Sequence, residues 1–428
     1  MPGKRIAFQT FGCKLNFAES STIARDLRAR AYEIVGYRDK ADVYVINSCL
    51  VTAQAEKKCR AAIRQAKKRN PGALVAVVGC FSQLRGQELA NMDEVDLVLG
   101  NDEKFGLHHF LHKAGKATGT LREAGDIGQS RLFVPSWSEG DRTRSFLKVQ
   151  DGCDYFCSYC SIPHARGRSR SARIADTMEA ARSIIAEGVK EIVITGVNIG
   201  DFGRQNGESF YQLLHELDKL GGIGRIRLSS IEPDLLDERI IRVMADSGRL
   251  LPHFHIPLQS GSDRILRAMN RKYDTGIFAD RVEKIRKLIP LACIATDVIT
   301  GFPGEGEADF SDTCRFLEGL DISYMHVFTY SARPGTAAAK FDHQTGNKIK
   351  KERSHILHLL SEEKKKAFYL KNVNTGASVL FESDNSNGHM HGFTRNYVRV
   401  KTAFDPALIN QIADVKLINM DEDGVFII

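Results

Sequence analysis

The sequence predicts an α/β protein of three parts: an N-terminal parallel α/β domain, a central partial (β/α)6 barrel and a small C-terminal β-barrel. Short apolar runs alternate with helical patterns through the first hundred residues, and this alternation resumes on a larger scale from Ser145. The chain from Asn372 onwards holds only short strand-like runs separated by turns. At 428 residues the chain is too long for one ordinary core. We expect a domain over residues 1–118, a linker over 119–143, the barrel with a basic connector helix over 144–371, and the last domain over 372–428.

The first domain contains four apolar runs, bounded by polar or glycine residues, that are typical of buried strands. They are Arg5–Thr10, Val43–Ser48, Ala73–Gly79 and Val95–Gly100. Cys13, Cys49 and Cys80 each follow the carboxyl end of one of these strands. Because such ends meet at one edge of a parallel sheet, we predict that the three cysteines converge on one site. The alternative is chance placement at strand ends, and Cys59, inside the helical pattern Ala53–Arg69, is expected to be structural.

A second group of cysteines, Cys153, Cys157 and Cys160, lies on one short segment with C-x3-C-x2-C spacing. Three thiolates on one loop can each bind one iron of a cubane cluster and leave the fourth iron open. A zinc site with His164 as fourth ligand, or simple buried thiols, would be the alternatives. The spacing favours an iron–sulfur cluster.

The barrel is predicted from six strand-like runs, too few for a closed eight-stranded barrel. They are Phe146–Gln150, Glu191–Thr195, Arg225–Ser229, His253–Leu258, Ala292–Ile299 and Met325–Thr329. Polar residues gather where these strands end, and active sites of such folds lie there. For Asp297 we expect a helix cap or turn. Trp137, in the predicted linker, is expected to pack against a neighbouring domain.

Composition describes a soluble globular protein, with 43% hydrophobic and 26% charged residues and a net charge of +7. No apolar run approaches the length needed to cross a bilayer, and the start of the chain has no signal-peptide pattern, so we expect no membrane. Nine cysteines, an odd number, argue against a disulfide framework and for a reducing, cytoplasmic location. The segment Lys348–Lys371 carries eight Lys/Arg against three Glu. It is either a connector helix or an RNA-facing one, with Ile349, Ile356, Leu359 and Leu360 on a partial apolar face.

The C-terminal tail is predicted to form strands at Ser378–Glu382, Tyr397–Val400, Asp414–Ile418 and Gly424–Ile427, with turns at Gly388, Gly392 and Asp423. Its four Lys/Arg are outnumbered by seven Asp/Glu, so RNA binding would need a local face. That face would comprise His391, Arg395, Arg399 and Lys401.

With these residues in hand, the sequence resembles the radical S-adenosylmethionine (SAM) methylthiotransferases along essentially its whole length. The resemblance rests on Thr10-Phe-Gly-Cys-Lys-Leu-Asn16, Asn47-Ser-Cys49, Gly79-Cys80 and the Cys153–Cys160 loop, while the tail resembles the RNA-binding TRAM domain. It implies two [4Fe–4S] clusters, an auxiliary one on Cys13, Cys49 and Cys80 and a SAM-binding one on Cys153, Cys157 and Cys160. The SAM contacts that we expect are Tyr159, Gly196, Ser230, Glu232 and Gln259.

Within this family, Ile162–Arg170 and Ile194–Gly200 most resemble the branch that acts on N6-threonylcarbamoyladenosine next to the tRNA anticodon. The branches that modify isopentenyladenosine or a ribosomal-protein aspartate are alternatives, and a non-catalytic metal-binding RNA-binding protein is the alternative from another class. In the implied reaction one SAM methylates a sulfide on the auxiliary cluster. A second SAM yields a 5′-deoxyadenosyl radical that takes hydrogen from C2 of the adenine, which no acid–base chemistry could activate.

The implied partners are tRNA and an electron donor of the flavodoxin or ferredoxin type. Arg166, Arg168 and Arg170 follow the cysteine loop and are expected to bind RNA phosphate or the carboxylate of the substrate, with packing on the barrel as the alternative.

Overall fold

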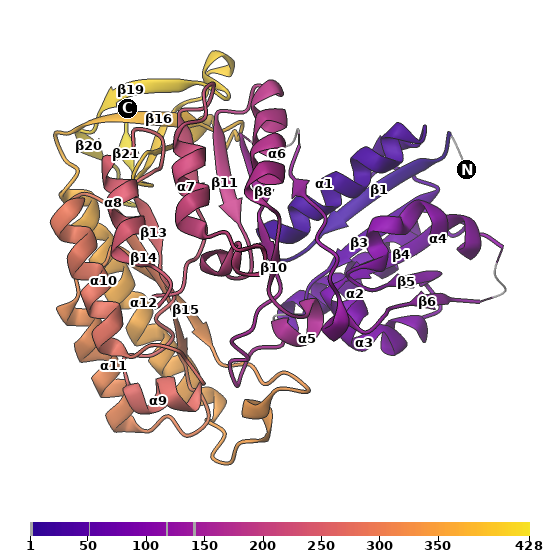
Figure 1. Ribbon diagram of the computed structural model, residues 1–428, viewed down its shortest axis with the longest axis horizontal. Helices are drawn as coiled ribbons and strands as arrows, with labels where there is room; N and C mark the ends of the chain where they lie inside the picture. Colours follow the sequence, from indigo (N-terminus) through magenta and orange to yellow (C-terminus); the bar gives the residue numbers. More distant parts are fainter. Residues whose placement is uncertain (1–2, 51, 117–118, 140–142) are drawn as a thin grey trace.

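A computed structural model describes residues 3–50, 52–116, 119–139 and 143–428. It has three parts (Figure 1): an N-terminal domain, a central barrel, and a C-terminal sheet at the end of the barrel away from the N-terminus. Residues 140–142, near the end of the predicted linker 119–143, lie outside the described residues. The predicted end of the first domain, residue 118, also lies outside them.

The N-terminal domain is a parallel six-stranded sheet in the order β2-β1-β3-β4-β5-β6. Its strands are β1 (Arg5–Thr10), β2 (Glu33–Val35), β3 (Val43–Ser48), β4 (Leu74–Gly79), β5 (Leu97–Leu99) and β6 (Leu121–Glu123). Helices α1 (Lys14–Ala29) and α4 (Leu107–Ala114) cover one face, and α2 (Ala53–Arg69) and α3 (Cys80–Ala90) cover the other. The expected parallel sheet is therefore confirmed, and Cys59 lies fully buried on α2.

The stretch predicted as a linker contributes a strand to each neighbouring sheet. β6 extends the N-terminal sheet, and β7 (Ser136–Trp137) pairs antiparallel with the first barrel strand. Both strands are too short to produce an apolar run, which is why the sequence pattern did not predict them. Trp137 packs against α1, with the Arg25 guanidinium 3.8 Å from its ring centroid.

The barrel has six parallel strands, as predicted. They are β8 (Arg144–Lys148), β11 (Glu191–Thr195), β12 (Arg225–Leu228), β13 (His253–His255), β14 (Cys293–Thr300) and β15 (Tyr324–Thr329). Ladders join β8, β11 and β12 and also β13, β14 and β15, and a parallel bridge between Ser230 and His255 connects the two groups. Two short strands, β9 (Gln150–Asp151) and β10 (Arg170–Ser171), flank the cysteine loop.

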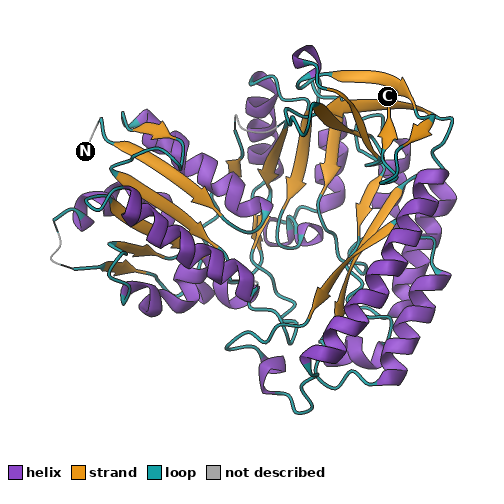
Figure 2. Cartoon of the chain, turned by 180° about the vertical axis from the view of Figure 1, so that it is seen from behind, coloured by secondary structure: helices purple, strands orange, loops and turns teal. Residues whose placement is uncertain are grey.

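Helices cover the outside of the barrel (Figure 2). They are α6 (Ile174–Ala186), α7 (Phe210–Asp218), α8 (Glu238–Asp246), α9 (Asp263–Ala268), α10 (Thr275–Leu288), α11 (Glu307–Gly319) and α12 (Asn347–Leu370), while the short α5 (Ile162–Arg166) follows the cysteine loop. Side-chain caps start several of them, for example Asp237 on Ile240 N and Asp274 on Ile277 N. Among the described residues, none of the helices is both long and apolar enough to cross a membrane.

The C-terminal residues form a six-stranded sheet in the order β19-β16-β17-β18-β21-β20. The strands are β16 (Gly376–Phe381), β17 (His389–Thr394), β18 (Arg399–Ala403), β19 (Ile412–Lys416), β20 (Asn419–Met420) and β21 (Phe426–Ile427). All neighbours pair antiparallel except β18 and β21. The resemblance of this sheet to a TRAM domain stays a prediction.

Candidate functional site

The auxiliary cysteines Cys13, Cys49 and Cys80 come from three adjacent parallel strands. Each follows the carboxyl end of β1, β3 or β4, which lie side by side in the sheet. A glycine with positive φ precedes both Cys13 and Cys80. A Cβ on Gly12 would lie 2.8 Å from Cys49 Sγ, so only glycine allows these loops to approach so closely. The predicted convergence of three strand ends is present in the structure.

Two asparagines brace these loops. Asn16 Nδ2 donates to the carbonyls of Phe11, at 2.8 Å, and Ser48, at 3.2 Å, which precede Cys13 and Cys49. Asn47 Nδ2 in turn donates to Asn16 O at 3.0 Å. The cysteine loops are thereby fixed to one another through buried hydrogen bonds, which are worth more than exposed ones because their partners cannot turn to water.

The loop of Cys153, Cys157 and Cys160 follows β9 at the mouth of the barrel. Arg271 donates to Cys157 Sγ at 3.1 Å, and the amide of Tyr155 donates to Cys153 Sγ at 3.4 Å. Burial raises the pKa of Cys153 and of Cys160 to about 12, so without a metal both are thiols. Iron binding there would displace protons, as metal binding to cysteine requires.

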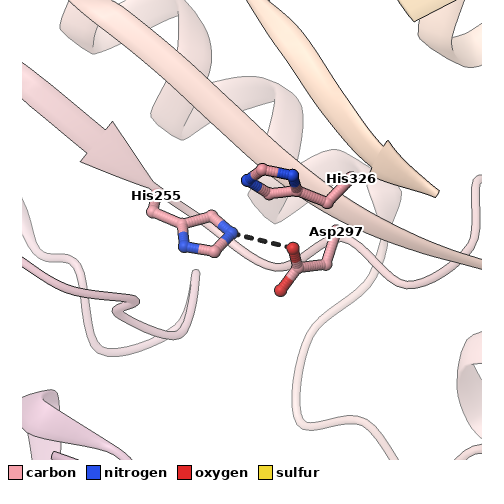
Figure 3. Close-up of side chains that lie close together, drawn as sticks. All are labelled: His255, Asp297 and His326. Carbon is pink, nitrogen blue, oxygen red and sulfur yellow. Dashed lines mark hydrogen bonds and ion pairs between the residues drawn. The ribbon is translucent and has the colours of Figure 1, made fainter. Parts of the chain in front are cut away.

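Neither cysteine triad is compact enough for one metal ion. Among the described residues, one group of three His, Cys, Asp or Glu side chains has its ligand atoms all within 4.8 Å of one another. It consists of His255, Asp297 and His326 (Figure 3) and contains no cysteine. Thiolates on one tetrahedral zinc lie about 4 Å apart, given a Zn–S distance of about 2.3 Å. Three cysteines that each bind a different iron of a cluster need to be farther apart, and this spacing favours the cluster over the zinc alternative.

A cavity of about 300 Å³ lies beside Cys160 and reaches the N-terminal domain at one residue, Thr52. From the barrel it is lined by Tyr159, Cys160 and Gln259, and from the N-terminal domain by Thr52, which caps α2 three residues after Cys49. Two of the expected SAM contacts, Tyr159 and Gln259, thus share one cavity with a cysteine of the loop.

Glu232 lies beside the same loop. It forms an ion pair with Arg271, the residue that donates to Cys157, and its charge acts on all three loop cysteines. Burial raises the pKa of Glu232 to about 7, although Arg271 opposes the shift. Gly196 follows β11, and a Cβ there would lie 2.9 Å from Gln150 Oε1, so the chain has no room for a larger residue at this strand end.

Ser230 belongs to a hydrogen-bonded chain that the sequence did not reveal. Its Oγ lies 2.8 Å from His255 Nδ1, and His255 Nε2 lies 2.8 Å from Asp297 Oδ1. Asp297 lines the cavity and sits inside β14, so the expectation of a helix cap or turn was wrong. These residues lie together because they occupy inward-facing positions of adjacent strands. Only the register in which β13 pairs with β14 could have indicated this contact.

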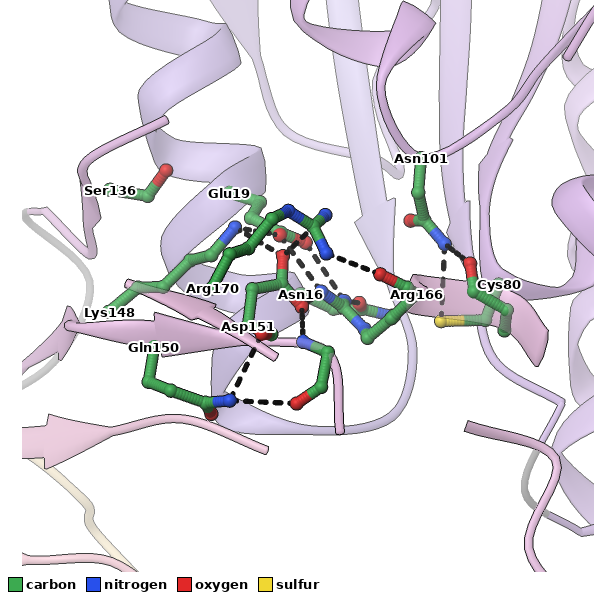
Figure 4. Close-up of polar contacts among 12 residues, drawn as sticks. Asn16, Glu19, Cys80, Asn101, Ser136, Lys148, Gln150, Asp151, Arg166 and Arg170 are labelled. Carbon is green, nitrogen blue, oxygen red and sulfur yellow. Dashed lines mark hydrogen bonds and ion pairs between the residues drawn. The ribbon is translucent and has the colours of Figure 1, made fainter. Parts of the chain in front are cut away.

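Arg166 and Arg170 are buried, which corrects the expectation that they bind RNA. Arg166 is 1% exposed and donates to Glu19, Asp151 and Asn16 at 2.6–3.0 Å (Figure 4). Arg170 is 5% exposed and donates to the carbonyls of Leu132 and Arg166. Guanidinium groups so fully engaged have no donor left for phosphate, so their role is to join the two domains.

The remaining predicted RNA contacts differ in how accessible they are. Arg395 donates to the carbonyls of Gly224 and Gly248 and so attaches the C-terminal sheet to the barrel, and Lys401 pairs with Asp421. Arg168 has a side chain that is 61% exposed, and Arg399 is also exposed. Arg168 and Arg399 are the exposed residues of the six, and RNA contact there stays a prediction.

Two family models match the chain. The model described as "Radical SAM superfamily" matches residues 147–317, and "Uncharacterized protein family UPF0004" matches residues 5–100. A relative from Aquifex aeolicus, "Threonylcarbamoyladenosine tRNA methylthiotransferase MtaB", is 39% identical over 93% of this chain and 96% of its own length. The chain belongs to the radical SAM tRNA methylthiotransferase family. It is therefore an enzyme of the radical SAM class, whose members use a [4Fe–4S] cluster and SAM.

Further relatives of this family differ in the substrate that their names state. The MtaB protein of Bacillus subtilis is 36% identical over 96% of this chain and 93% of its own length. The "tRNA-2-methylthio-N(6)-dimethylallyladenosine synthase" of Alkaliphilus oremlandii is 33% identical over 97% and 90%. Among solved structures, the radical SAM methyltransferase TsrM of Kitasatospora setae has a TM-score of 0.60 at 13% identity, covering 90% of this chain and 79% of its own. That likeness concerns the fold alone.

Proposed function

We propose that this enzyme adds a methylthio group to C2 of N6-threonylcarbamoyladenosine next to the anticodon of tRNA. The observation that carries the proposal is a cavity lined by Cys160 and by Thr52, three residues after Cys49, in a chain that is 39% identical to an enzyme named for this substrate. The relatives named for dimethylallyladenosine match at 31–35% identity and those named for threonylcarbamoyladenosine at 34–39%. The sequence resemblance at Ile162–Arg170 favours the same substrate.

The two triads would hold two [4Fe–4S] clusters, and both donor sets fit. Each triad offers three cysteines, and a cubane cluster held by three thiolates has one iron open for a small ligand. Cys153, Cys157 and Cys160 would hold the cluster that binds SAM, and Cys13, Cys49 and Cys80 the auxiliary one. When bound, these groups supply the electron that cleaves SAM and the sulfur for the product.

The side chains of the chain itself would orient the reactants. Tyr159 and Gln259 line the wall of the cavity next to Cys160, where SAM would lie, and Arg271 stabilises the thiolate of Cys157. Asp297, held by His255, offers a fixed carboxylate on the same wall. The target base reaches this cavity only if it is unstacked, which suits a nucleotide of the anticodon loop better than a paired one.

The test of the substrate is a competition between two tRNAs. One carries threonylcarbamoyladenosine and the other isopentenyladenosine at the same position, and the methylthio nucleosides are quantified by mass spectrometry. We expect the threonylcarbamoyl tRNA to be preferred, because the relative that matches at 39% identity is named for that substrate. Equal or greater turnover of the isopentenyl tRNA would contradict the substrate and leave the reaction class intact.

The cluster count has its own test. Anaerobically reconstituted protein should hold about eight irons per chain, and replacing either triad by alanine should remove about half of them. A triad variant that keeps all its iron would refute the assignment of that triad. The electron donor, of flavodoxin or ferredoxin type, the cytoplasmic location and RNA binding by the C-terminal sheet remain parts of the same proposal.

A further inference from the structure

Asn101, which follows β5, links the auxiliary cysteines to the helix behind the SAM-cluster loop. Its side chain is buried, with 3% of the residue exposed. Nδ2 donates to Cys80 Sγ at 3.7 Å and to the carbonyl of Ala165 at 2.7 Å, and Oδ1 accepts from Lys104 Nζ at 2.7 Å (Figure 4 shows the first two). One amide thus contacts a cluster ligand, α5 and a buried cation.

The orientation of this amide is fixed by its partners. Lysine can only donate and a carbonyl can only accept, so Oδ1 must face Lys104 and Nδ2 must face Ala165. Cys80 Sγ therefore receives an N–H and not a carbonyl oxygen. Such a contact favours the more negative state of any cluster bound there.

The charges behind Asn101 act in the same direction. Lys104 is fully buried and donates to Glu19, which also binds Arg166 and Lys148. The whole network contains four cations and three anions, which leaves one positive charge in excess. The cations are Lys104, Lys148, Arg166 and Arg170, and the anions are Glu19, Asp151 and Asp102. A buried excess charge needs an anionic partner, and a thiolate-bound cluster at Cys80 would be that partner.

The second contact of Asn101 fixes the position of α5. Ala165 lies five residues after Cys160, and Arg166, next to it, donates to Asn16, which holds the loops of Cys13 and Cys49. Two adjacent residues of α5 are therefore tied to all three auxiliary cysteine loops. Any shift of α5 would move the auxiliary site together with the SAM-cluster loop.

We propose that Asn101 is a positioning residue that sets the reduction potential of the auxiliary cluster and fixes its spacing from the SAM-binding cluster. The inference rests on the two-cluster part of the proposed function. It assigns to Asn101 a role that neither the cysteine motifs nor the sequence pattern indicated. The amide acts through Cys80 and touches neither SAM nor the substrate.

The test uses two backgrounds that each retain one cluster. In protein with Cys153, Cys157 and Cys160 replaced by alanine, Asn101→Leu should lower the potential of the remaining cluster in an EPR-monitored redox titration. We expect at least a tenfold change in the one-electron equilibrium constant, about 59 mV. In protein with Cys13, Cys49 and Cys80 replaced by alanine, the same substitution should leave the potential unchanged. In the first background, the pulsed EPR spectrum of the Asn101→Leu variant should also lack one exchangeable deuteron coupling. In the second background, the substitution should remove no coupling.

Each other outcome contradicts the inference. An unchanged potential in the first background would exclude the hydrogen bond to Cys80 as a determinant, and equal shifts in both backgrounds would indicate general loosening of the fold. Should Asn101→Leu not fold, Asn101→Asp keeps the shape and the contact with Lys104 but cannot donate, so it should lower the potential too. If the parent of the first background holds no cluster, the two-cluster proposal itself fails, and this inference fails with it.

Discussion

Single residues with the same sequence context have opposite roles in this chain. Arg166, Arg168 and Arg170 alternate with small residues after the cysteine loop, and nothing in that pattern separates them. The structure buries Arg166 and Arg170 between two domains and leaves Arg168 at the surface. The partner that decides the role of Arg166 is Glu19, which lies 147 residues away in the sequence, so only the tertiary fold reveals it. Local charge patterns predict that basic residues are present but not what they bind.

The first prediction concerns Arg166. Replacing it by methionine removes the buried hydrogen bonds to Glu19, Asp151 and Asn16, which costs about 1.5–3 kcal/mol even though Lys148 still pairs with both carboxylates. Urea unfolding should show this loss, and Arg166→Lys, which keeps the charge, should lose less. Arg168→Met is the matched control and should change stability by less than about 0.5 kcal/mol, because that side chain is mostly exposed. Similar stability of the two methionine variants would contradict the structural role.

Secondary-structure elements were predictable where the hydrophobic signal is long. β1, β3 and β11 match their predicted bounds, and so does α2, because each has an uninterrupted apolar run or a clear helical period. β17 was missed since Gly392, expected in a turn, lies inside it. A Cβ at that position would lie 2.5 Å from Val379 Cγ1 on β16, so the glycine allows two strands to pack closely.

The long helix α12 shows how a periodic pattern can mislead. Ile349, Ile356 and Leu359 were expected on its apolar face, but each is at least 43% exposed. Leu357 is buried instead, next to Arg353, which forms an ion pair with Glu305. In a helix this rich in lysine, several faces have similar hydrophobicity, so the sequence pattern does not decide which face is buried. The ion pair of Arg353 with Glu305 decides it by holding one face against the barrel.

The second prediction concerns the attachment of the C-terminal sheet. Glu191, fully buried, pairs with Arg144, Arg225 and Arg227, and Arg225 and Arg227 donate to carbonyls of the sheet. Glu191→Gln should leave Arg225 and Arg227 uncompensated, while Arg144 keeps its ion pair with Glu382, and should cost about 3–5 kcal/mol. Hydrogen exchange should then accelerate in β16 and β17. The exposed Glu216→Gln on α7 is the control and should change nothing there.

Acid should have the same effect as this substitution. Although burial raises it, the three arginines lower the pKa of Glu191 from 4.5 to about 2. A carboxyl with a depressed folded pKa contributes stability that is fully present above pH 4.5 and is lost as the pH falls towards about 2. The wild type should therefore lose about 3 kcal/mol over this range. The Glu191→Gln variant should lose correspondingly less, and equal acid sensitivity of the two proteins would contradict the assignment.

At the scale of the whole molecule, the candidate site exists only where two domains meet. The sequence indicated each cysteine triad from strand ends and spacing, but not the cavity that lies beside Cys160 and reaches the N-terminal domain at Thr52. That cavity depends on α1 packing along β7 and β8 and on contacts from the end of the barrel to the N-terminal domain. Such contacts join residues hundreds of positions apart, for which a single sequence carries no signal.

Arg333 provides the contact that closes this cavity, and it carries the last prediction. It lines the cavity beyond β15, is 8% exposed, and donates to Glu56 on α2 at 2.5 Å and to the carbonyl of Leu50, next to Cys49. Arg333→Ala should loosen the N-terminal domain against the barrel while leaving both cysteine triads in place. A displacement of about 1 Å between reacting groups can cost about a hundredfold in rate.

The Arg333→Ala enzyme should therefore still cleave SAM but waste most of the radicals. The ratio of 5′-deoxyadenosine to methylthiolated nucleoside, measured by mass spectrometry, should rise at least tenfold over wild type at equal iron content. Arg333→Lys keeps the charge opposite Glu56 and should lie between the two. If 5′-deoxyadenosine and product instead fall in the same proportion, Arg333 serves SAM cleavage itself, and the view that domain docking couples the two halves of the reaction is wrong.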